Sequence, residues 1–380
     1  MPGGKKKAPE RACPCQATRQ SKGQAERTAL TAAGLVTLRR RYLSCPACGS
    51  GCHPRDGWLG LAGFLSPQAQ RLTCLAAASW SFDRASDLLQ ELCGLRVSDT
   101  TIRAAAVEVG SQIRAWQRRS DAPAAAFAAV AGDIEFSTDG TSVNTLQGWR
   151  EMRLAIFAKR PRGPAATPAQ WDQRDLPPPA ARVLFGGLWT AQQFGPQWRA
   201  WAGRLGIKEA SEITVLADGA KWIWNQAGQN FPGAAGVLDI YHASEHLYGA
   251  AKALYGEGAD EVPAWVEARR QTLLQGGAAA LEAELAAEQR SLRSARKQAA
   301  LAALRDYLAP HQQHTAYARR LQQGRAIGSG MVEGACKTVV GKRLKQTGAR
   351  WRVRHAERLV ALCGLLYSDL WDDYWSPPHN

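Results

Sequence analysis

The chain lacks any apolar run of the roughly 18 residues that a membrane-spanning helix needs. Its N-terminus is basic but has no apolar segment of the kind found in a secretory signal, so we expect no export. The nine cysteines are an odd number in a chain without that signal, and they do not predict a disulfide framework. These absences argue against a membrane protein and against a secreted disulfide-rich domain. We therefore expect a soluble, cytoplasmic protein.

Positive charge is abundant and unevenly distributed. The 380 residues have a formal net charge of +15 at pH 7. Residues 1–55 hold eleven Lys or Arg against two acids, and residues 325–358 hold nine against two, so the rest of the chain is nearly neutral. A neutral scaffold with two basic segments is typical of a protein that binds a polyanion at two places. Basic tails that only aid solubility are the alternative.

Five of the nine cysteines fall within the first 52 residues. Two short-spaced thiol pairs could clamp one tetrahedral zinc ion, which takes four such ligands. We predict that residues 1–60 form a basic DNA-binding segment, irregular over 1–34 and extended over 35–43. Its structural zinc would be held by Cys13, Cys15, Cys45 and Cys48, with Cys52 and His53 as spare ligands. Unpaired surface cysteines are the alternative.

Residues 61–125 are predicted to form a helical domain. The expected helix starts and breaks are Pro67, Ser81, Gly94 and Ser98. Two helices joined by a glycine-containing turn outline a helix-turn-helix-like domain that binds DNA. A helix pair that serves only for packing is the alternative. The alanine-rich stretch 122–132 is expected to be a linker.

From residue 126 the pattern changes to α/β. The predicted strands are 133–139, 151–158, 182–189, 212–217 and 234–240, and the predicted helices are 191–205, 220–229 and 242–253. This order favours a sheet of mixed direction over residues 126–250. Residues 251–325 have no strand signal and are predicted to be a helical insertion. Residues 326–380 are predicted to complete the domain with C-terminal helices at 331–346 and 353–371.

Two aspartates follow apolar strand segments, and one glutamate opens a later helix. Asp139 ends the first predicted strand and Asp218 the fourth, and we expect those strands to be neighbours. A glycine follows each aspartate, which lets the backbone turn sharply and leaves the carboxylate unobstructed. Together with Glu333, these carboxylates suit two Mg²⁺ ions, or Mn²⁺, at a phosphodiester. Taken singly, each is an ordinary turn residue or an acid at a helix start.

The helix that Glu333 opens, and the segment after it, are strongly basic. Lys337 comes four residues after Glu333, so both lie on one helix face. Trp351, between two arginines, either stacks on an unpaired base or anchors the core. We predict DNA contacts, mainly to phosphates, for Lys337, Lys342, Arg343, Lys345, Arg350, Trp351, Arg352 and Arg354.

Several motifs carry a resemblance to a known family: Thr138–Thr141, Leu216–Trp222, Leu238–His246 and Ile327–Lys337, with Arg343–Gln346, Gly348–Trp351 and Cys45–Gly49. Over nearly its whole length the chain resembles bacterial insertion-sequence transposases of the DDE type, in the Kra/Lre-like group. The resemblance implies a ribonuclease-H-like catalytic domain that binds the terminal inverted repeats of its element, cuts the DNA and joins the ends to a target.

The same resemblance assigns roles to residues. Asp139, Asp218 and Glu333 map onto the metal-binding triad of that family, and His242 onto a histidine that supports the active site. By analogy, the expected partners are double-stranded DNA, as element ends and target, and further copies of the chain. A bacterial, nucleoid-associated location is implied as well.

Three other functions stay open at this point. One is a ribonuclease-H-fold nuclease or resolvase that cuts DNA without joining it. A second is a zinc-dependent DNA-binding repressor whose catalytic fold is inactive. The third comes from the H-x-x-E-H pattern of His242, Glu245 and His246, which also occurs in zinc peptidases; a pair of surface residues on a helix is its plain alternative.

Overall fold

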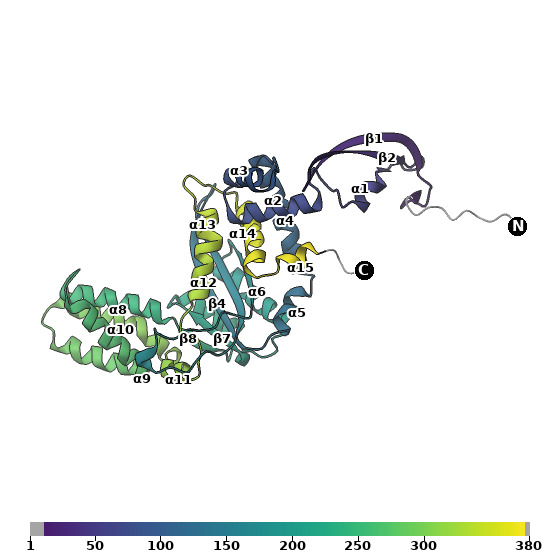
Figure 1. Cartoon of the computed structure of the whole chain (residues 1–380). Coiled ribbons are helices and arrows are strands. Elements are labelled where there is room, and N and C mark those ends of the chain that lie inside the picture. Colours follow the sequence, from purple (N-terminus) through teal and green to yellow (C-terminus); the bar gives the residue numbers. More distant parts are fainter. Residues whose placement is uncertain (1–10, 377–380) are drawn as a thin grey trace. The chain divides into compact units, whose positions relative to one another are not determined.

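The computed structural model describes residues 11–376, which divide into two units after Val109 (Figure 1). The basic run Lys5–Lys7 and the terminal Pro377 and Pro378 lie outside the described residues. Within residues 11–376, no helix is both long and apolar enough to cross a membrane.

The first unit begins with a three-stranded antiparallel sheet. Strands β1 (Gln20–Thr31), β2 (Gly34–Ser44) and β3 (Gly51–Cys52) follow one another in that order. The prediction of a strand at 35–43 is confirmed, but the prediction of irregular structure over 1–34 was wrong for residues 20–31, and residues 1–10 lie outside the described residues. In β1 only Ala29 and Leu30 are buried, so the apolar alternation that marks a half-buried strand is missing from its sequence. Pairing with β2 forms the strand instead.

Four helices follow: α1 (Pro54–Trp58), α2 (Pro67–Ser79), α3 (Phe82–Cys93) and α4 (Asp99–Gln117). The predicted starts and breaks are confirmed. The Ser81 hydroxyl accepts the backbone N–H of Arg84, and the Ser98 hydroxyl accepts that of Thr101. Gly94 ends α3 in the left-handed conformation, at φ 66°. The division between the two units falls inside α4, which continues into the second unit.

The second unit contains a five-stranded mixed sheet. Its strands are β4 (Asp133–Thr145), β5 (Gly148–Arg160), β6 (Ala181–Gly187), β7 (Ile213–Ala217) and β8 (Ala235–Leu238), in the order β6-β5-β4-β7-β8. Strand β5 is antiparallel to both neighbours, whereas β4, β7 and β8 are parallel. All five predicted strands exist, and the predicted mixed α/β sheet is confirmed.

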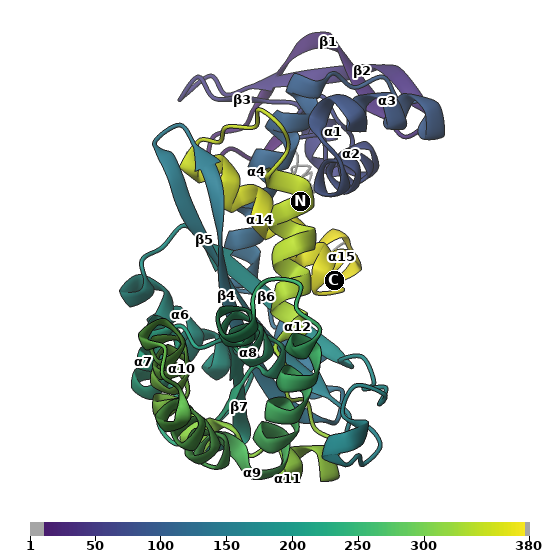
Figure 2. The same ribbon diagram turned by 90° about the vertical axis from the view of Figure 1, so that its left-hand side faces the viewer.

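The first strand of this sheet is longer than its apolar segment. Beyond Ser137, β4 pairs with β5 alone, apart from a bridge between Thr145 and Trp351. Figure 2 shows the resulting β4–β5 hairpin extending past the other strands. The prediction that the strand ends at Asp139 was therefore wrong, because the polar residues after it are held by cross-strand hydrogen bonds rather than by burial.

Helices cover both faces of the sheet. Helices α5 (Ala122–Ala128), α6 (Ala191–Arg204) and α7 (Lys221–Asn230) enclose an aromatic core on one face, in which the rings of Phe136 and Trp198 lie 4.9 Å apart. The expected linker at 122–132 is partly this short α5, and its buried Phe127 explains the difference. On the opposite face, α8 (Ile240–Tyr255) packs under β7 and β8.

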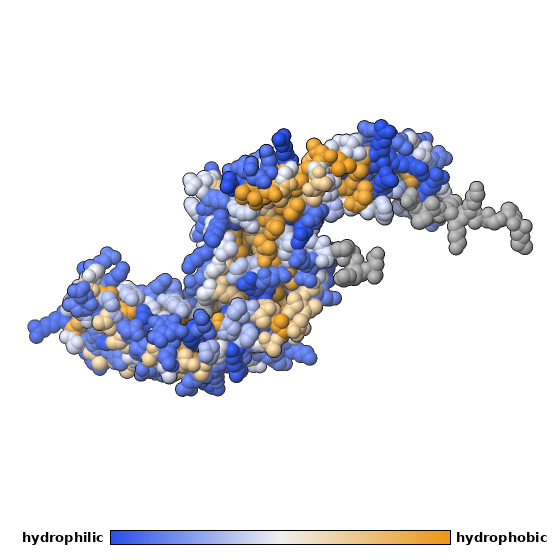
Figure 3. Space-filling view, in the orientation of Figure 1, coloured by the Kyte–Doolittle hydropathy of each residue, from blue (hydrophilic) through white to orange (hydrophobic). Residues whose placement is uncertain are grey.

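Residues 251–325 are predicted to be helical without strands, and the structure shows helices and no strand there. The segment after α8 consists of α9 (Glu261–Ser291), α10 (Ala295–Leu308), the 3-10 turn η4 (Ala309–His314) and α11 (Tyr317–Gln322). Helices α8, α9 and α10 lie side by side (Figure 2) and share one leucine-rich core. Their outer surface is largely hydrophilic in the view of Figure 3.

The C-terminal region returns to the sheet. It comprises α12 (Gly330–Ala335), the π-helical turn η5 (Cys336–Gly341), α13 (Lys342–Leu344), α14 (Val353–Tyr367) and α15 (Trp371–Trp375). Helix α12 contacts β4 and β5, and α14 packs on β6. Two further 3-10 turns, η2 (Pro168–Gln170) and η3 (Ala210–Glu212), interrupt connecting loops.

Candidate functional site

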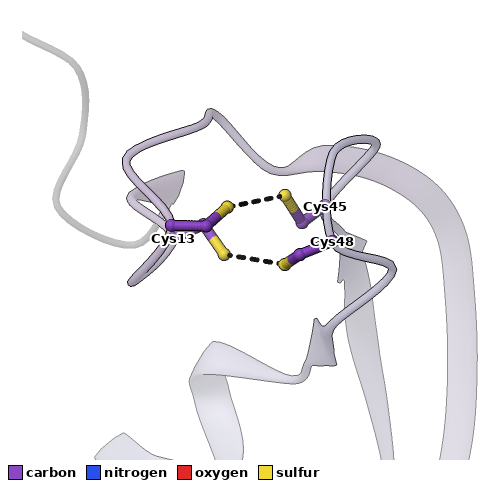
Figure 4. Close-up of side chains that lie close together, drawn as sticks. Cys13, Cys45 and Cys48 are labelled. Atoms are coloured by element: carbon purple, nitrogen blue, oxygen red, sulfur yellow. Dashed lines mark hydrogen bonds between the residues drawn. The ribbon is translucent and has the colours of Figure 1, made fainter.

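The four predicted zinc-ligating cysteines come together in the first unit. Their Sγ atoms all lie within 4.8 Å of one another, and the Cys13–Cys48 and Cys15–Cys45 pairs are 3.5 Å apart. Figure 4 shows the side chains of Cys13, Cys45 and Cys48 pointing toward each other. Sulfurs around a tetrahedral zinc at about 2.3 Å would be ~3.8 Å apart. The cluster therefore has the ligand types and the spacing for a metal ion such as zinc.

Two tight turns present these thiols. The first turn is closed by the Gln16 N–H, which donates to the Cys13 carbonyl over 2.9 Å, and Gln16 adopts a left-handed conformation at φ 69°. The second follows β2, where the Gly49 N–H donates to the Cys45 carbonyl over 3.0 Å. Cys52 and His53, the spare ligands, are not members of the cluster.

A serine hydroxyl prepares part of the cluster for a cation. Ser50 Oγ lies 3.3 Å from Cys13 Sγ and 3.2 Å from Cys48 Sγ. Its hydrogen bond lowers the pKa of Cys13 to about 6 and also lowers the pKa of Cys48. The backbone N–H of Ala17 favours the Cys15 thiolate too, but the neighbouring thiols outweigh it and raise the pKa of Cys15 to about 12. Without an ion, the four sulfurs cannot all be thiolates, which are the form that binds zinc.

Asp139 lies on β4, and Asp218 comes directly after the adjacent parallel strand β7. The last paired residues of β4 and β7 are Ser137 and Leu216, and each aspartate comes two residues later. The two side chains therefore project on the same side of the sheet at its carboxyl edge. Burial raises the pKa of Asp139, and the charge of Asp218 raises it further. The predicted pairing of these strands is confirmed.

The glycines after the two aspartates serve a different purpose from the predicted sharp turn. Neither Gly140 nor Gly219 has a positive φ. A Cβ on Gly140 would lie 2.1 Å from Glu151 Oε1, and one on Gly219 would lie 2.3 Å from a ring carbon of Tyr307. At Gly219 the tyrosine ring leaves no room for a Cβ, whereas at Gly140 the flexible Glu151 side chain would have to move aside. Neither approach can be read from the local sequence.

Glu333 reaches the same neighbourhood from α12. It lines a cavity of about 260 Å³ together with Asp139, Lys337 and Lys345. Burial raises the pKa of Glu333, as do the charges of Asp239 and Asp139, whereas Lys337 lowers it. The Cys336 thiol donates to the Asp139 carboxylate, so this cysteine is also part of the site. Lys345 Nζ closes the cavity by donating to Thr141 Oγ1.

The acidic site is an open group rather than a compact one. Among residues 11–376, the cysteine cluster is the one group of three or more His, Cys, Asp or Glu ligands close enough to share a single ion. Asp139 and Glu333 line one cavity, but Asp218 is linked to it only through its electrostatic effect on Asp139. The three carboxylates share a neighbourhood without forming a closed cage.

A fourth acid, Asp239, positions the start of α8 and the loop before α12 by hydrogen bonds. It is fully buried and immediately follows β8, and its Oδ1 accepts the His242 N–H over 2.8 Å to cap α8. Its Oδ2 accepts the backbone N–H and the hydroxyl of Ser329, the latter over 2.7 Å. Asp239 thus fixes the loop from which α12 and Glu333 project. Its place at the end of an apolar run, like that of Asp218, was the signal that could have identified it.

The predicted supporting histidine lies at the start of α8. His242 Nδ1 is 3.4 Å from Glu245 Oε2, and its ring is 5.2 Å from that of His246. His246 stacks on Tyr307 of α10 at 3.7 Å. No compact ligand group among residues 11–376 includes these histidines, so the peptidase pattern finds no third ligand.

Tyr307 was missed by sequence reasoning, because α10 carries no motif. Its hydroxyl is buried without a hydrogen-bond partner and lies 3.1 Å from the Cβ position of Gly219, next to Asp218. Burial, and then the charge of Asp218, raise the pKa of Tyr307, so the phenol stays protonated at neutral pH.

Most of the predicted DNA-contacting residues are exposed, but two are not free to bind DNA. Lys337, Lys342, Lys345, Arg350, Arg352 and Arg354 are exposed. Arg343 is only 2% exposed and lies 5.5 Å over the Trp351 ring, so its predicted phosphate contact was wrong. Trp351 bridges to the β4–β5 hairpin, and its Nε1 donates to the Leu344 carbonyl over 2.9 Å. The core-anchor interpretation of Trp351 therefore fits the structure better than base stacking.

No protein-family model matches the sequence, and no curated protein matches it.

Proposed function

We propose that this protein is a metal-dependent DNA strand-cleaving and strand-joining enzyme, an insertion-sequence transposase with a ribonuclease-H-like catalytic domain. The observation that carries the proposal is the placement of Asp139 on β4 and of Asp218 directly after the adjacent parallel strand β7, with Glu333 lining the same cavity as Asp139. The strand order, with one antiparallel strand beside parallel neighbours, is consistent with that domain.

The donor set suits hard divalent cations. Asp139, Asp218 and Glu333 would hold two Mg²⁺ or Mn²⁺ ions, which prefer carboxylate oxygens and take few of them from the protein. Bound there, such ions supply activation of the attacking oxygen and neutralisation of the leaving oxygen. Burial is the main cause of the raised pKa values of Asp139 and Glu333, and neighbouring carboxylates raise them further; a bound cation would offset both effects. An open ligand group leaves positions for phosphate oxygens and water.

The remaining residues of the cavity have roles of their own. Lys337 and Lys345 place two positive charges beside the carboxylates and would hold a phosphate of the substrate. The Cys336 thiol orients the Asp139 carboxylate by donating to it. Exposed Lys342, Arg350, Arg352 and Arg354 extend the basic surface and would follow the DNA backbone.

The first unit would bind DNA rather than cut it. A zinc ion in the cysteine cluster would clamp the turn before β1 to the turn after β2 and so fix a hairpin that carries Arg39, Arg40 and Arg41. Helices α3 and α4 have the outline of a helix-turn-helix. Recognition of element ends is the role that we propose for this unit.

A cleavage and joining assay tests the proposal. The full chain is incubated with labelled duplex DNA carrying the sequences that flank its gene, with Mg²⁺, Mn²⁺ or a chelator. We expect metal-dependent cleavage that Asp139→Asn and Asp218→Asn each reduce at least about a thousandfold, because several kcal/mol of charge stabilisation is lost. DNA binding by these variants persists. Asp306→Asn, a matched change at an exposed acid on α10, keeps the wild-type rate.

The alternatives give different results in the same assay. A pre-cut end with a free 3′-hydroxyl is offered together with a plasmid target, and joined product supports the transposase. Cleavage without joining supports the nuclease or resolvase. Binding without cleavage at any divalent ion supports the repressor and overturns the proposal.

A further inference from the structure

A second charged cleft lies along the outer edge of β6. Two cavities of about 210 Å³ each share Arg118, Trp201 and Arg204 in their walls. Neither cavity has a lining residue in common with the acidic cavity. In the described part of the chain, no further strand pairs with β6 beyond β5, and α6 and α14 supply the walls of the cleft at this edge of the sheet.

The charged residues that line this cleft are mostly arginines. Besides Arg118 and Arg204, the walls include Arg114 and Arg119, and the one carboxylate among the lining residues is Asp121. Arg114 is already neutralised by Glu357, whose Oε2 lies 3.1 Å from its Nη1. The other three arginines leave an excess of positive charge. We refer to Arg118, Arg119 and Arg204 as the arginine cleft.

Two of these cations line the same cavities and are held by no ion pair with the residues that the structure describes, although Asp121 lies near enough to raise the pKa of Arg204. Among residues 11–376, no ion pair or side-chain hydrogen bond occupies the guanidinium of Arg118 or Arg204. Arg204 is half-buried and lies 4.8 Å over the ring of Trp201, which fixes its plane. Burial lowers the pKa of Arg204, and the charge of Arg118 lowers it further. A bound anion would remove this repulsion.

The charged lining of the cleft, which is mostly guanidinium groups, suits a phosphodiester ligand. A guanidinium offers two parallel N–H donors to phosphate oxygens, and one held against an aromatic ring has lost little freedom still to be ordered. A groove with several arginines and walls of α6 and α14 can follow successive phosphates of a backbone.

We propose that the arginine cleft binds the phosphate backbone of duplex DNA, as a contact separate from the acidic site. This inference rests on the proposed function, which makes DNA the substrate, and adds a second place where the second unit holds it. The contact is sequence-independent, because only phosphates are touched.

Salt-dependent binding of a short random-sequence duplex to the full chain tests the inference. The double variant Arg118→Gln/Arg204→Gln is expected to reduce the slope of log affinity against log salt by about two, since each lost phosphate contact removes about 0.9. Affinity at low salt falls about tenfold or more. Arg118→Lys/Arg204→Lys retains the wild-type slope. Arg199→Gln, a matched change at an exposed arginine of α6 that lines neither cavity, leaves the slope unchanged.

A second measurement does not depend on how well the double variant folds. A photoreactive benzoylphenylalanine replaces Arg118 in one protein and Arg199 in another. Crosslinking to the duplex from position 118, but not from 199, supports the inference. Equal crosslinking from both positions, or none from 118, overturns it.

The outcomes separate this inference from the proposed function. If the wild-type chain binds and cuts DNA while the double variant keeps the wild-type slope, the arginine cleft is not a DNA contact and the proposed function stands. A poly-glutamate peptide is offered as a second polyanion. If position 118 crosslinks to this peptide but not to the duplex, the inference is also overturned. If the wild-type chain binds no duplex, the inference and the proposed function fall together.

Discussion

The cysteine cluster and the acidic site are two candidate metal centres built in contrasting ways. The cluster takes four thiols from two turns, one before β1 and one after β2, and all its ligand atoms fall within 4.8 Å. The acidic site takes its carboxylates from β4, β7 and α12, and they do not close around one point. The first arrangement leaves no vacant ligand position, which is typical of a structural ion, and the second leaves room for substrate oxygens.

Electrostatics separates the two centres as well. A hydroxyl donor favours thiolates in the cluster, where it lowers the pKa of Cys13 to about 6. In the acidic site, burial and neighbouring negative charges raise the pKa values of Asp139 and Glu333. The cluster therefore gains order from its ion, whereas the acidic site gains charge compensation. Four predictions test this contrast.

The largest effect is expected from removing a thiol. Cys45→Ser should abolish tight zinc binding and release the β1–β2 hairpin, because a structural zinc site contributes on the order of 10 kcal/mol to folding. Metal content by mass spectrometry and hydrogen exchange of the β1 and β2 amides measure both effects. Cys52→Ser is the matched control, since this half-buried cysteine lies outside the cluster. One zinc still bound per chain in Cys45→Ser would remove the contrast.

The next effect concerns chemistry without loss of fold. Glu333→Gln should lower the cleavage rate about a thousandfold while thermal stability and DNA affinity stay near wild type, because charge stabilisation of several kcal/mol is lost. Single-turnover cleavage beside an equilibrium binding curve measures this. Glu257→Gln, at an acid that is 87% exposed, should change neither. Equal loss of binding and cleavage in Glu333→Gln would mean that the glutamate is structural.

A smaller effect is expected at Tyr307. Tyr307→Phe should slow cleavage about ten- to hundredfold, the size of one hydrogen bond to a charged group, if its unpartnered hydroxyl donates to a phosphate or a water at the site. Stability should not fall, since no hydrogen bond within the protein is removed. Tyr255→Phe, at a tyrosine that is 42% exposed, is the control. A wild-type rate in Tyr307→Phe would assign the ring to packing alone.

The smallest expected effect is on stability. Here the substitution should stabilise the protein rather than destabilise it. The pKa of Asp139 is raised in the folded protein above its ordinary value of 3.8, so its ionised form destabilises the fold at neutral pH. Wild-type stability in a chelator should therefore increase as pH falls through that raised pKa toward 3.8. Asp139→Asn should melt slightly higher than wild type at neutral pH and lose this pH dependence.

Adding Mg²⁺ completes this comparison. The wild type should gain stability from the ion and Asp139→Asn should gain less, because a ligand that binds only the folded state stabilises it. Thermal unfolding across this pH range, with chelator or Mg²⁺, gives all four curves. A lower melting temperature of Asp139→Asn in chelator would show that the carboxylate is not under electrostatic strain.

Sequence reasoning predicted the elements whose local residue pattern is sufficient to identify them. All five sheet strands were found because they contain short, largely apolar segments; Ile213–Ala217, for example, is buried throughout and has one polar residue, Thr214. Serine caps and the glycine break located α3 and α4. The cysteine ligands were found because their short spacings are local. These signals depend only on neighbours along the chain.

The features that the sequence did not predict depend on contacts between residues distant along the chain. Strand β1 forms through pairing with β2, although its own pattern gives no strand signal. The Arg343 side chain is buried against Trp351, which nothing in a basic run predicts. Gly219 is required by Tyr307, which is contributed by a helix of the insertion. Such requirements come from tertiary packing, and a single sequence does not contain them in readable form.

The π-helical turn η5 has a consequence for the spacing between Glu333 and Lys345, which line one cavity although twelve positions separate them. At about 100° per residue, an unbroken α-helix would point them about 120° apart. A π turn absorbs one residue and reduces that angular offset to about 20°. Deleting one residue from the turn would restore a plain helix with both side chains still in phase, whereas inserting one would rotate the lysine away. Shortened forms of this segment are therefore compatible with the site, and lengthened ones are not.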